Sequence, residues 1–500
     1  MEFLVNTDHP GKQHTDCLIL AVYDNRLLTP SAMGLDKVSH AFLSTVLKTG
    51  DLDGKAGKTL LLHSVPNLVA TRVLLVACGE EKALNDKIFR DILKKTISAL
   101  QPTGIKNALC TLTELPVNDR NAHWKTRQIV EIFVSCSYQF NTFKSKPETD
   151  LHPLTRVLLT VPAADLAMAE RAVLEGLAIS NGVKKAKDLS NTPANICTPS
   201  FLAQQAQNLA VTFPSIRTTV LDEKQIATLK MGALLAVGQG SIYPPKFITI
   251  EYGDKTLKPI VLVGKGITFD TGGNSLKTPS SMIGMKFDMC GGASVLGALE
   301  AIAELKLPLH VIGVIPTAEN MPGAAATRPD DIVTTLSGQT VEILNTDAEG
   351  RLILCDALTY CERFNPETVI DIATLTGACV MALGAYPSGL FSNHAPLAQA
   401  LLEAGTLSGD RCWELPLWED YQEALSSNYA DIANIGNTPE GGAITAACFL
   451  ARFTKEYHWA HLDVAGTARG AGKEKGATGR PIPLLVQYLI NCATAGTSGK

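Results

Sequence analysis

The stretch 345–352 carries the residues whose types and spacing are best suited to chemistry. It has the sequence Asn-Thr-Asp-Ala-Glu-Gly-Arg-Leu and lies between two apolar runs. In an extended segment, side chains two positions apart lie on the same side, so this spacing predicts that Asp347, Glu349 and Arg351 share one face. Gly350 would let the backbone come close to whatever these groups hold. The pattern alone is also typical of a polar hairpin, so its meaning depends on other charged segments.

Two such segments precede it. Residues 264–277 have the sequence Gly-Lys-Gly-Ile-Thr-Phe-Asp-Thr-Gly-Gly-Asn-Ser-Leu-Lys, in which Lys265, Asp270 and Lys277 are framed by four glycines. The glycines indicate tight turns, but their spacing does not fit a dinucleotide-binding loop. Asp288 follows within Met-Lys-Phe-Asp-Met-Cys-Gly-Gly, where a carboxylate could also cap the next helix.

Together these segments supply the carboxylates of Asp270, Asp288, Asp347 and Glu349. Carboxylates that share a cleft repel one another unless positive charge lies between them. Lysine and arginine could neutralise part of this charge, but a pair of divalent ions does so better, and oxygen ligands suit Mg²⁺, Mn²⁺ or Zn²⁺. Two metal ions can generate hydroxide at neutral pH and polarise a carbonyl group. The residues therefore predict metal-assisted hydrolysis.

The elements that must position these residues are strands that are apolar on both faces. Runs of this kind occupy 260–263, 310–315 and 369–372, and helical patterns occupy 293–305 and 353–364. Continuous apolar strands separated by helices predict a mostly parallel sheet that is covered by helices on both faces. In such sheets ligands bind at the carboxyl ends of the strands, which is where the charged segments fall.

The first third of the chain alternates short strands and helices. Strand-like runs cover 17–22, 59–63, 73–78, 108–112 and 156–161, and helical spacing covers 87–100 and 123–138. A long helical pattern then runs from Asp165 to Asp188. Because 500 residues exceed what one core usually supports, we predict a two-domain α/β protein. A smaller N-terminal α/β domain would span 1–164, a connecting helix 165–190, and a larger catalytic domain 191–500.

The composition and the net charge limit which partners the protein could bind and which cell compartment it could occupy. A net charge of −5 and a pI near 6.1 give no overall excess of positive charge, so nucleic acid is not the expected partner. No apolar run approaches the roughly 18–20 residues that span a bilayer, and the first residues lack the pattern of a signal peptide. The 12 cysteines include no Cys-x-x-Cys pair, which is typical of a protein of the reducing cytoplasm.

The three charged motifs, with Ala-Thr-Leu-Thr-Gly-Ala at 373–378 and His-Leu-Asp-Val-Ala-Gly-Thr at 461–467, resemble the leucyl aminopeptidase family, peptidase family M17. The likeness is to the bacterial aminopeptidase A type and covers essentially the whole chain, more weakly before about Asp188. It implies a cytoplasmic homohexamer that releases leucine and other N-terminal residues from peptides with a free N-terminus.

The resemblance also implies a role for each matching position. One metal ion would be held by Asp270, Asp347 and Glu349, and the other by Lys265, Asp270, Asp288 and Glu349. Mn²⁺ or Zn²⁺ would fill both sites, with Mg²⁺ as a further option.

Outside the metal ligands, Lys277 would polarise the scissile carbonyl, and Arg351 would hold a bicarbonate ion that relays a proton. Met285, Thr374 and Gly377 would line the pocket for the first side chain of the substrate.

Two residues depart from the family pattern. Asn274 stands where an aliphatic residue is usual, and Thr278 stands where many members have proline, which leaves the side-chain preference open.

Two other functions are compatible with the residues alone. The same carboxylates could serve a di-metal phosphoesterase. A basic face in the N-terminal domain could instead bind DNA or a protein partner; its members would be Lys94, Lys95, Arg120, Lys125 and Arg127. Basic residues on a helix are more often a solvated surface.

Overall fold

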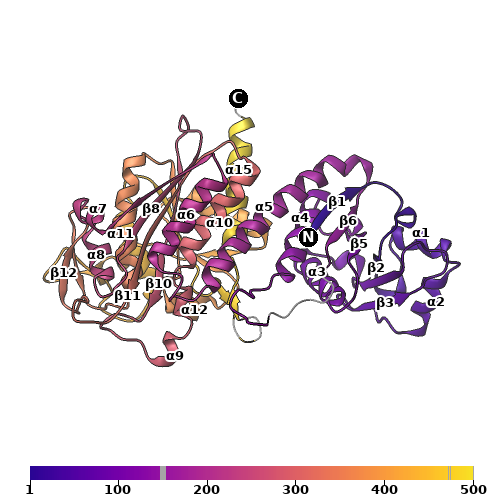
Figure 1. The fold of residues 1–500 in the computed structure, drawn as a ribbon, viewed down its shortest axis with the longest axis horizontal. Coiled ribbons are helices and arrows are strands. Elements are labelled where there is room, and N and C mark those ends of the chain that lie inside the picture. The colour runs from indigo at the N-terminus through magenta and orange to yellow at the C-terminus, as the bar shows by residue number, and fades with distance from the viewer. Residues whose placement is uncertain (147–153, 471, 473–474, 499–500) are drawn as a thin grey trace. The chain divides into compact units, whose positions relative to one another are not determined.

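The computed structural model describes residues 1–146, 154–470, 472 and 475–498. The chain divides into two compact units, Met1–Ser180 and Asn181–Lys500, and each contains its own sheet (Figure 1). The predicted two-domain α/β class is confirmed. The helix α5 runs over Leu166–Asn191 and includes the point of division, where a long helix was expected. The exact domain boundaries at 164 and 190 remain a prediction.

The N-terminal unit contains a six-stranded sheet in the order β1-β6-β5-β2-β4-β3. Its strands are β1 (Glu2–Asn6), β2 (Cys17–Val22), β3 (Thr59–His63), β4 (Arg72–Ala77), β5 (Asn107–Cys110) and β6 (Arg156–Thr160). Alternate residues of β2 face opposite sides because side chains alternate along a strand. Ile19 packs with α3 (Asp86–Leu100) and α4 (Ala122–Cys136), whereas Leu18 packs with α1 (Pro30–Val38) and α2 (Phe42–Thr49).

The C-terminal unit is built on a nine-stranded sheet. Its strands are β7 (Ile216–Leu221), β8 (Lys246–Gly253), β9 (Ile260–Gly264), β10 (Gly266–Asp270), β11 (His310–Asn320), β14 (Thr368–Ala373), β15 (Ser388–Ser392), β16 (Cys412–Glu414) and β18 (His458–Asp463). The central strands β18, β14, β9 and β11 are parallel, and β10 runs parallel to β11. Antiparallel pairing is confined to β7 with β8, β8 with β11, and β15 with β18. The expectation of a mostly parallel central sheet is therefore confirmed.

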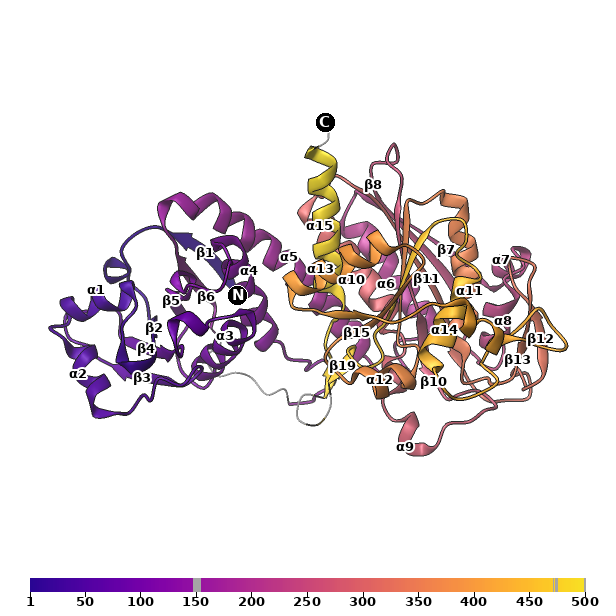
Figure 2. The same ribbon diagram turned by 180° about the vertical axis from the view of Figure 1, so that it is seen from behind.

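Helices cover both faces of this sheet (Figures 1 and 2). One layer contains α6 (Pro199–Thr212), α10 (Cys290–Leu305), α13 (Ala395–Ser408) and α15 (Ile482–Ser498). The other contains α8 (Gly232–Gly238), α11 (Glu349–Cys361) and α14 (Gly442–Ala451), which share one apolar core with the facing side of β9, β11 and β14. Both faces of the central strands are therefore removed from water, which explains their continuous apolar sequences.

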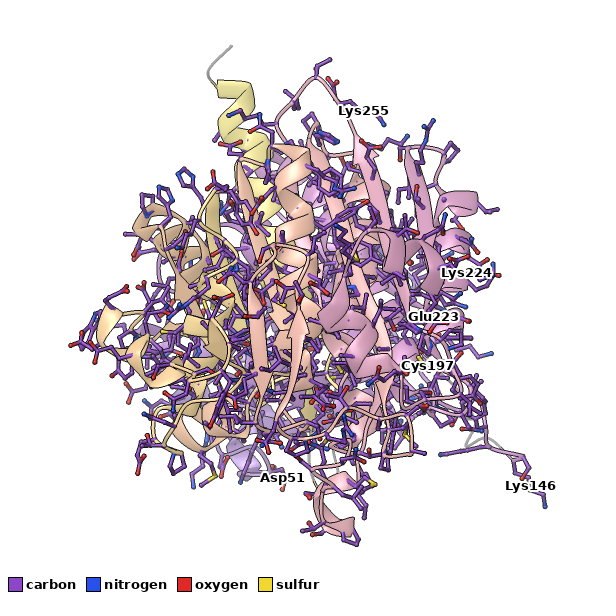
Figure 3. All side chains as sticks on the ribbon, turned by 90° about the vertical axis from the view of Figure 1, so that its left-hand side faces the viewer. Asp51, Lys146, Cys197, Glu223, Lys224 and Lys255 are labelled. Carbon is purple, nitrogen blue, oxygen red and sulfur yellow. The ribbon has the colours of Figure 1, made fainter. Side chains whose placement is uncertain are left out.

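Smaller elements complete the unit. A three-stranded sheet joins β12 (Asp331–Thr334), β13 (Thr340–Ile343) and β17 (Ile432–Ala433). Short helices α7 (Glu223–Thr228), α9 (Pro279–Met282) and α12 (Gly377–Leu383) lie on the loops. Figure 3 shows Glu223 and Lys224 at the start of α7, and Lys255 in the turn that follows β8. No helix in the described part of the chain combines the length and apolarity needed to cross a membrane.

The structure corrects two local predictions. The segment 345–352 is not extended: β13 ends at Ile343, and Glu349 begins α11, so Glu349 and Arg351 lie on the first helical turn. The segment 264–277, whose glycines indicated tight turns, also contains a strand, because Gly266–Asp270 forms β10. Both errors come from short windows in which tertiary packing outweighs local pattern. In addition, β1 at the N-terminus was not anticipated.

Candidate metal centre

The charged residues of the three motifs meet at the carboxyl ends of the parallel strands. Lys265 lies between β9 and β10, and Asp270 is the last residue of β10. Thr374 directly follows β14, and Asp463 ends β18. Lys255 marks the opposite edge of the sheet, because Gly253 at the end of β8 pairs with the first residue of β11 (Figure 3). The sheet topology therefore places these residues at one edge of the sheet, where the parallel strands have their carboxyl ends.

The carboxylates form one cluster with two lysines among them. Asp270, Asp347 and Glu349 each offer an oxygen, and these oxygens lie within 4.8 Å of one another. The Lys265 Nζ lies 2.8 Å from Asp288 Oδ2 and 2.8 Å from Glu349 Oε1. The Lys277 Nζ lies 2.7 Å from Asp270 Oδ2 and also pairs with Asp347. The structure thus brings together six of the seven residues predicted as metal ligands or charged catalytic groups, and the seventh is Arg351.

Most charged side chains of this cluster are buried, so any unbalanced charge among them costs free energy. Lys265, Asp270, Asp288 and Glu349 are each less than 10% exposed. Burial and the neighbouring Asp270 raise the pKa of Glu349 to about 8, and burial raises the pKa of Asp288 to about 6. Burial lowers the pKa of Lys265, but Asp288 and Glu349 more than reverse this, so its net pKa is raised. The carboxylates therefore need positive charge nearby to remain ionised at neutral pH.

The cluster also includes a carboxylate oxygen that could bind a metal ion. Glu349 Oε2 is buried, and within the described residues it has no hydrogen-bond partner. A buried oxygen of this kind costs free energy unless something binds it. Together with the close oxygens of Asp270 and Asp347, it forms a donor set suited to a hard or borderline divalent cation. The residues present therefore fit a metal ion.

Glycines make the close approach possible. A Cβ on Gly350 would lie 2.6 Å from Lys265 Cε and 2.7 Å from its Nζ, so only glycine leaves room for this lysine. The backbone of Gly272 and Gly273 is left-handed, with φ of 88° and 63°, a conformation that glycine adopts without steric cost. This turn returns the chain from Asp270 towards Lys277.

Arg351 is buried beside the cluster, at 7% exposure. Its Nη1 donates to the Asn434 carbonyl at 2.8 Å, whereas its Nε has no hydrogen-bond partner among the described residues. Burial lowers the pKa of Arg351 to about 10, which leaves the guanidinium charged at neutral pH. A buried donor without a partner fits a small anion.

The three residues expected to line a substrate pocket lie on loops around the cluster. Thr374 donates its hydroxyl to Asp288 Oδ1 at 2.7 Å, and its carbonyl accepts from Lys265 Nζ at 3.0 Å. Gly377 begins α12 and is exposed, with no atom within 4 Å of the position of a Cβ. Met285 begins the 3₁₀ turn Met285–Phe287 that leads to Asp288. The Asp288 carboxylate thus contacts Lys265 and Thr374 and does not cap the next helix, since α10 has no side-chain hydrogen bond at its N-cap.

The two positions that depart from the family pattern have local roles. Asn274 donates to the Thr327 carbonyl at 2.9 Å. Thr278 caps the short helix α9, since its hydroxyl accepts from Ser281 N. Neither residue bonds to a carboxylate of the cluster in these contacts.

Four polar residues that hold the cluster in place were missed from the sequence. They are Asn320, Thr346, Asn434 and Asp463, all less than 10% exposed. Asp463 accepts from Leu375 N at 3.2 Å and from the Thr376 hydroxyl at 2.7 Å. The available signal was a polar residue at the end of an apolar strand, which describes Asn320 and Asp463.

Three of the five residues considered for a basic face of the N-terminal domain, Arg120, Lys125 and Arg127, form contacts within the protein. Arg120 forms two hydrogen bonds with the carboxylate of Asp86, and Arg127 is buried and bonds to Glu131 at 2.5 Å. Lys125 donates to the Leu115 carbonyl. These contacts leave no support for a DNA-binding face built on these residues.

Comparisons with known proteins agree with this geometry. Residues 184–486 match the cytosol aminopeptidase family, catalytic domain, and residues 19–147 match its N-terminal domain. The chain is 54% identical to a "Probable cytosol aminopeptidase" of Thioalkalivibrio sulfidiphilus, over 99% of this chain and 100% of the relative. It is also 54% identical to one of Photobacterium profundum, over 99% of each chain.

Among solved structures, the bottromycin maturation enzyme BotP has a TM-score of 0.83 and 31% identity, over 96% of this chain and 100% of BotP. A structure of BotP in complex with Mn gives the same TM-score at 32% identity. Both family domains are matched in order, and the relatives align from end to end. The chain is therefore a peptidase that belongs to the cytosol aminopeptidase family, peptidase family M17.

Proposed function

We propose that the protein is a leucyl aminopeptidase that depends on two divalent metal ions and releases leucine and other N-terminal residues from peptides. The observation that carries this proposal is the cluster of Asp270, Asp347 and Glu349, in which Asp270 and Glu349 are buried and the carboxylate oxygens of all three residues lie within 4.8 Å of one another. The family membership and the similar BotP structure in complex with Mn support it.

The residues would divide between two sites. Asp270, Asp347 and Glu349 would hold one ion, and Lys265, Asp270, Asp288 and Glu349 would hold the other. Mn²⁺ or Zn²⁺ is proposed, with Mg²⁺ as a further option. Such ions, when bound, activate water at neutral pH and polarise a carbonyl group. Lys265 would serve as a neutral amine, which requires two dications to reverse the effect that the carboxylates have on its pKa.

Lys277 would act on the substrate directly. Burial lowers its pKa, but Asp270 more than reverses this, so the side chain stays protonated at neutral pH. Its ammonium would donate to the scissile carbonyl oxygen and stabilise the oxyanion that develops in the transition state. Arg351, whose Nε has no hydrogen-bond partner in the described part of the chain, would hold bicarbonate in an orientation suited to proton transfer.

The specificity for a free N-terminus would follow from recognition of the substrate's α-amine within the cluster. Met285, Thr374 and Gly377 would line the pocket for the first side chain. We extend the proposal to a cytoplasmic homohexamer. The sequence contains no Cys-x-x-Cys pair, which agrees with a reducing compartment.

The test compares a leucine-initiated peptide with its N-acetylated form, with the purified protein stripped of metal and then supplied with Mn²⁺ or Zn²⁺. We expect hydrolysis of the free peptide alone, lost on chelation and restored by metal. Equal cleavage of both peptides would rule out an aminopeptidase. Chelator-resistant activity in a sample shown by elemental analysis to be metal-free would rule out the metal centre. Sedimentation velocity tests the hexamer independently.

A further inference from the structure

Asn320 is a buried amide that contacts two of the loops forming the cluster. It ends β11 and is 4% exposed. Its Nδ2 donates to Asp270 Oδ1 at 2.8 Å and to the Thr346 carbonyl at 3.0 Å. Both partners are acceptors, so the nitrogen of the amide must be the atom that faces them. One side chain thus joins Asp270 to the backbone immediately before Asp347.

These contacts assign different tasks to the two oxygens of Asp270. Oδ1 accepts from Asn320 Nδ2 and from Gly272 N at 2.9 Å, so protein donors occupy it. Oδ2 faces the other way and lies 2.7 Å from Lys277 Nζ. The carboxylate cannot rotate without breaking the bonds to Oδ1, so Oδ2 is the oxygen presented to the centre of the cluster.

The backbone of Asn320 strengthens the same connection. Its carbonyl accepts from Thr271 N at 3.0 Å and from the Thr271 hydroxyl at 2.8 Å. Asp270 and Asn320 are also paired across the parallel strands β10 and β11. The main chain and the side chain of Asn320 therefore both connect the end of β10 to β11.

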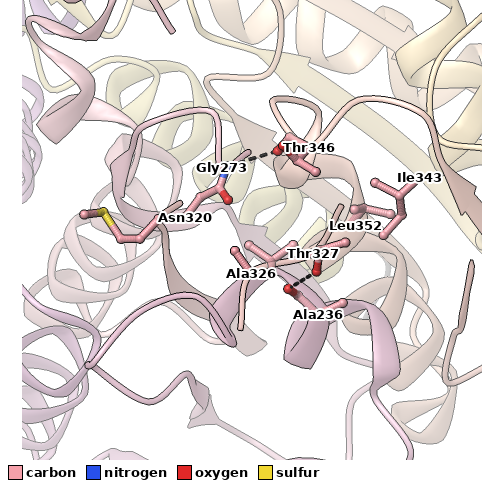
Figure 4. Close-up of a pocket in the computed structure, with 10 residues that line it drawn as sticks. Ala236, Gly273, Asn320, Ala326, Thr327, Ile343, Thr346 and Leu352 are labelled. Atoms are coloured by element: carbon pink, nitrogen blue, oxygen red, sulfur yellow. Dashed lines mark hydrogen bonds between the residues drawn. The ribbon is translucent and has the colours of Figure 1, made fainter. Parts of the chain in front are cut away.

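Packing leaves the amide little freedom. A Cβ on Gly273 would lie 2.9 Å from Asn320 Oδ1, so this glycine packs directly against the amide. Beside it lies a cavity of about 10 Å³, lined by Asn320, Gly273 and Thr346 among others, which is about the size of one water molecule. Figure 4 shows the amide at this cavity, bonded to Thr346.

We propose that Asn320 is a positioning residue that holds Asp270 and the Asp347 loop at the separation a metal ion requires. The inference rests on the proposed function. Asn320 contacts Asp270 directly and the residue before Asp347, so two of the three ligands of the Asp270–Asp347–Glu349 site depend on it. In the second proposed site only Asp270 does. Loss of the amide should therefore weaken the first site more than the second.

The experiment measures Mn²⁺ binding to the metal-free protein by calorimetry. Wild type should show two binding steps, and Asp347→Ala identifies the step that belongs to the first site by abolishing it. We expect Asn320→Ala to weaken this step about 10–100-fold, the usual effect of removing a residue that orients a metal ligand, and to change the other step less. Asn320→Thr, a β-branched residue suited to a strand, also lacks the amide and should behave alike.

The matched control is Asn393→Ala. Like Asn320, Asn393 donates from its Nδ2 to two acceptors, which here are the backbone carbonyls of Thr454 at 3.1 Å and Tyr457 at 3.2 Å, just before β18 and away from the cluster. It should bind Mn²⁺ like wild type. Folded Asn320 variants that lose no more affinity than this control, or that lose it equally in both steps, would overturn the proposal. A wild type that binds no Mn²⁺ or Zn²⁺ would instead refute the proposed function.

Discussion

The sharpest test of the cluster geometry is Gly350→Ala. A Cβ at this position would lie 2.6–2.9 Å from three successive atoms of Lys265, whereas ordinary contacts begin at 3.4 Å. The lysine would have to retreat by about 0.8 Å, because the helix backbone of α11 cannot yield easily in a close-packed interior. Its contacts of 2.8–3.0 Å with Asp288, Glu349 and the Thr374 carbonyl would then lengthen beyond hydrogen-bond range.

The effect should appear in function rather than in folding. Alanine favours a helix over glycine by about 1 kcal/mol, which offsets part of the steric cost. Misplacement of a catalytic-site group by about 1 Å costs about 10²-fold in rate, so we expect kcat/KM to fall by that factor, together with weaker Mn²⁺ binding.

The assay measures kinetics with leucyl anilide, Mn²⁺ affinity and thermal unfolding on the same preparations. Gly323→Ala is the matched control, since its nearest neighbour would lie 3.6 Å from the new Cβ. Wild-type rate and affinity in Gly350→Ala would refute the conclusion that Lys265 needs this space.

Three further changes probe separate parts of the unit. Lys277→Ala should lower kcat by about 10²–10³-fold without loss of bound metal if the ammonium stabilises an oxyanion, while Lys255→Ala at the far edge should leave kinetics unchanged. Burial, partly offset by backbone N–H groups, raises the pKa of Asp356 from 3.8 to about 7. Between these values the folded protein binds more protons than the unfolded chain. The free energy of unfolding should therefore fall as pH rises from about 4 to about 7, by at most about 1.4 kcal/mol per pH unit. This dependence should disappear in Asp356→Asn when urea unfolding is followed across the range. Asp463→Ala removes the acceptor for Leu375 N, and kcat/KM should fall about 10-fold, equivalent to one charged hydrogen bond of about 1.5 kcal/mol; unchanged peptide kinetics would contradict this role.

Much of the fold was predictable because burial leaves a direct mark on sequence. The strands β2 and β3 have the predicted bounds, whereas β9 is one residue longer at one end and β14 is one residue longer at each end. Strands covered on both faces must be apolar throughout, so their position and parallel arrangement follow from composition. The chemical types of the cluster were equally visible, since carboxylates and lysines beside glycines stand out in an apolar context.

Local conformation at the site was less predictable. The alternation of Asp347, Glu349 and Arg351 predicted an extended segment, but α11 begins at Glu349 and has no side-chain cap to announce it. Eleven of its thirteen residues are buried, so packing against the sheet, rather than an amphipathic pattern, stabilises the helix. A short polar window contains no information about that packing.

Sequence alone determined which residue types were available and that they lie at strand ends. Only the tertiary structure decided which atoms meet: that Gly350 makes room for Lys265, and that Asn320, fifty positions along the chain, donates a hydrogen bond to Asp270. The physical reason is that neighbouring strands of a parallel sheet are joined by long crossovers. Residues fifty or more positions apart therefore meet at one edge, and their sequence separation says nothing of the distance between them.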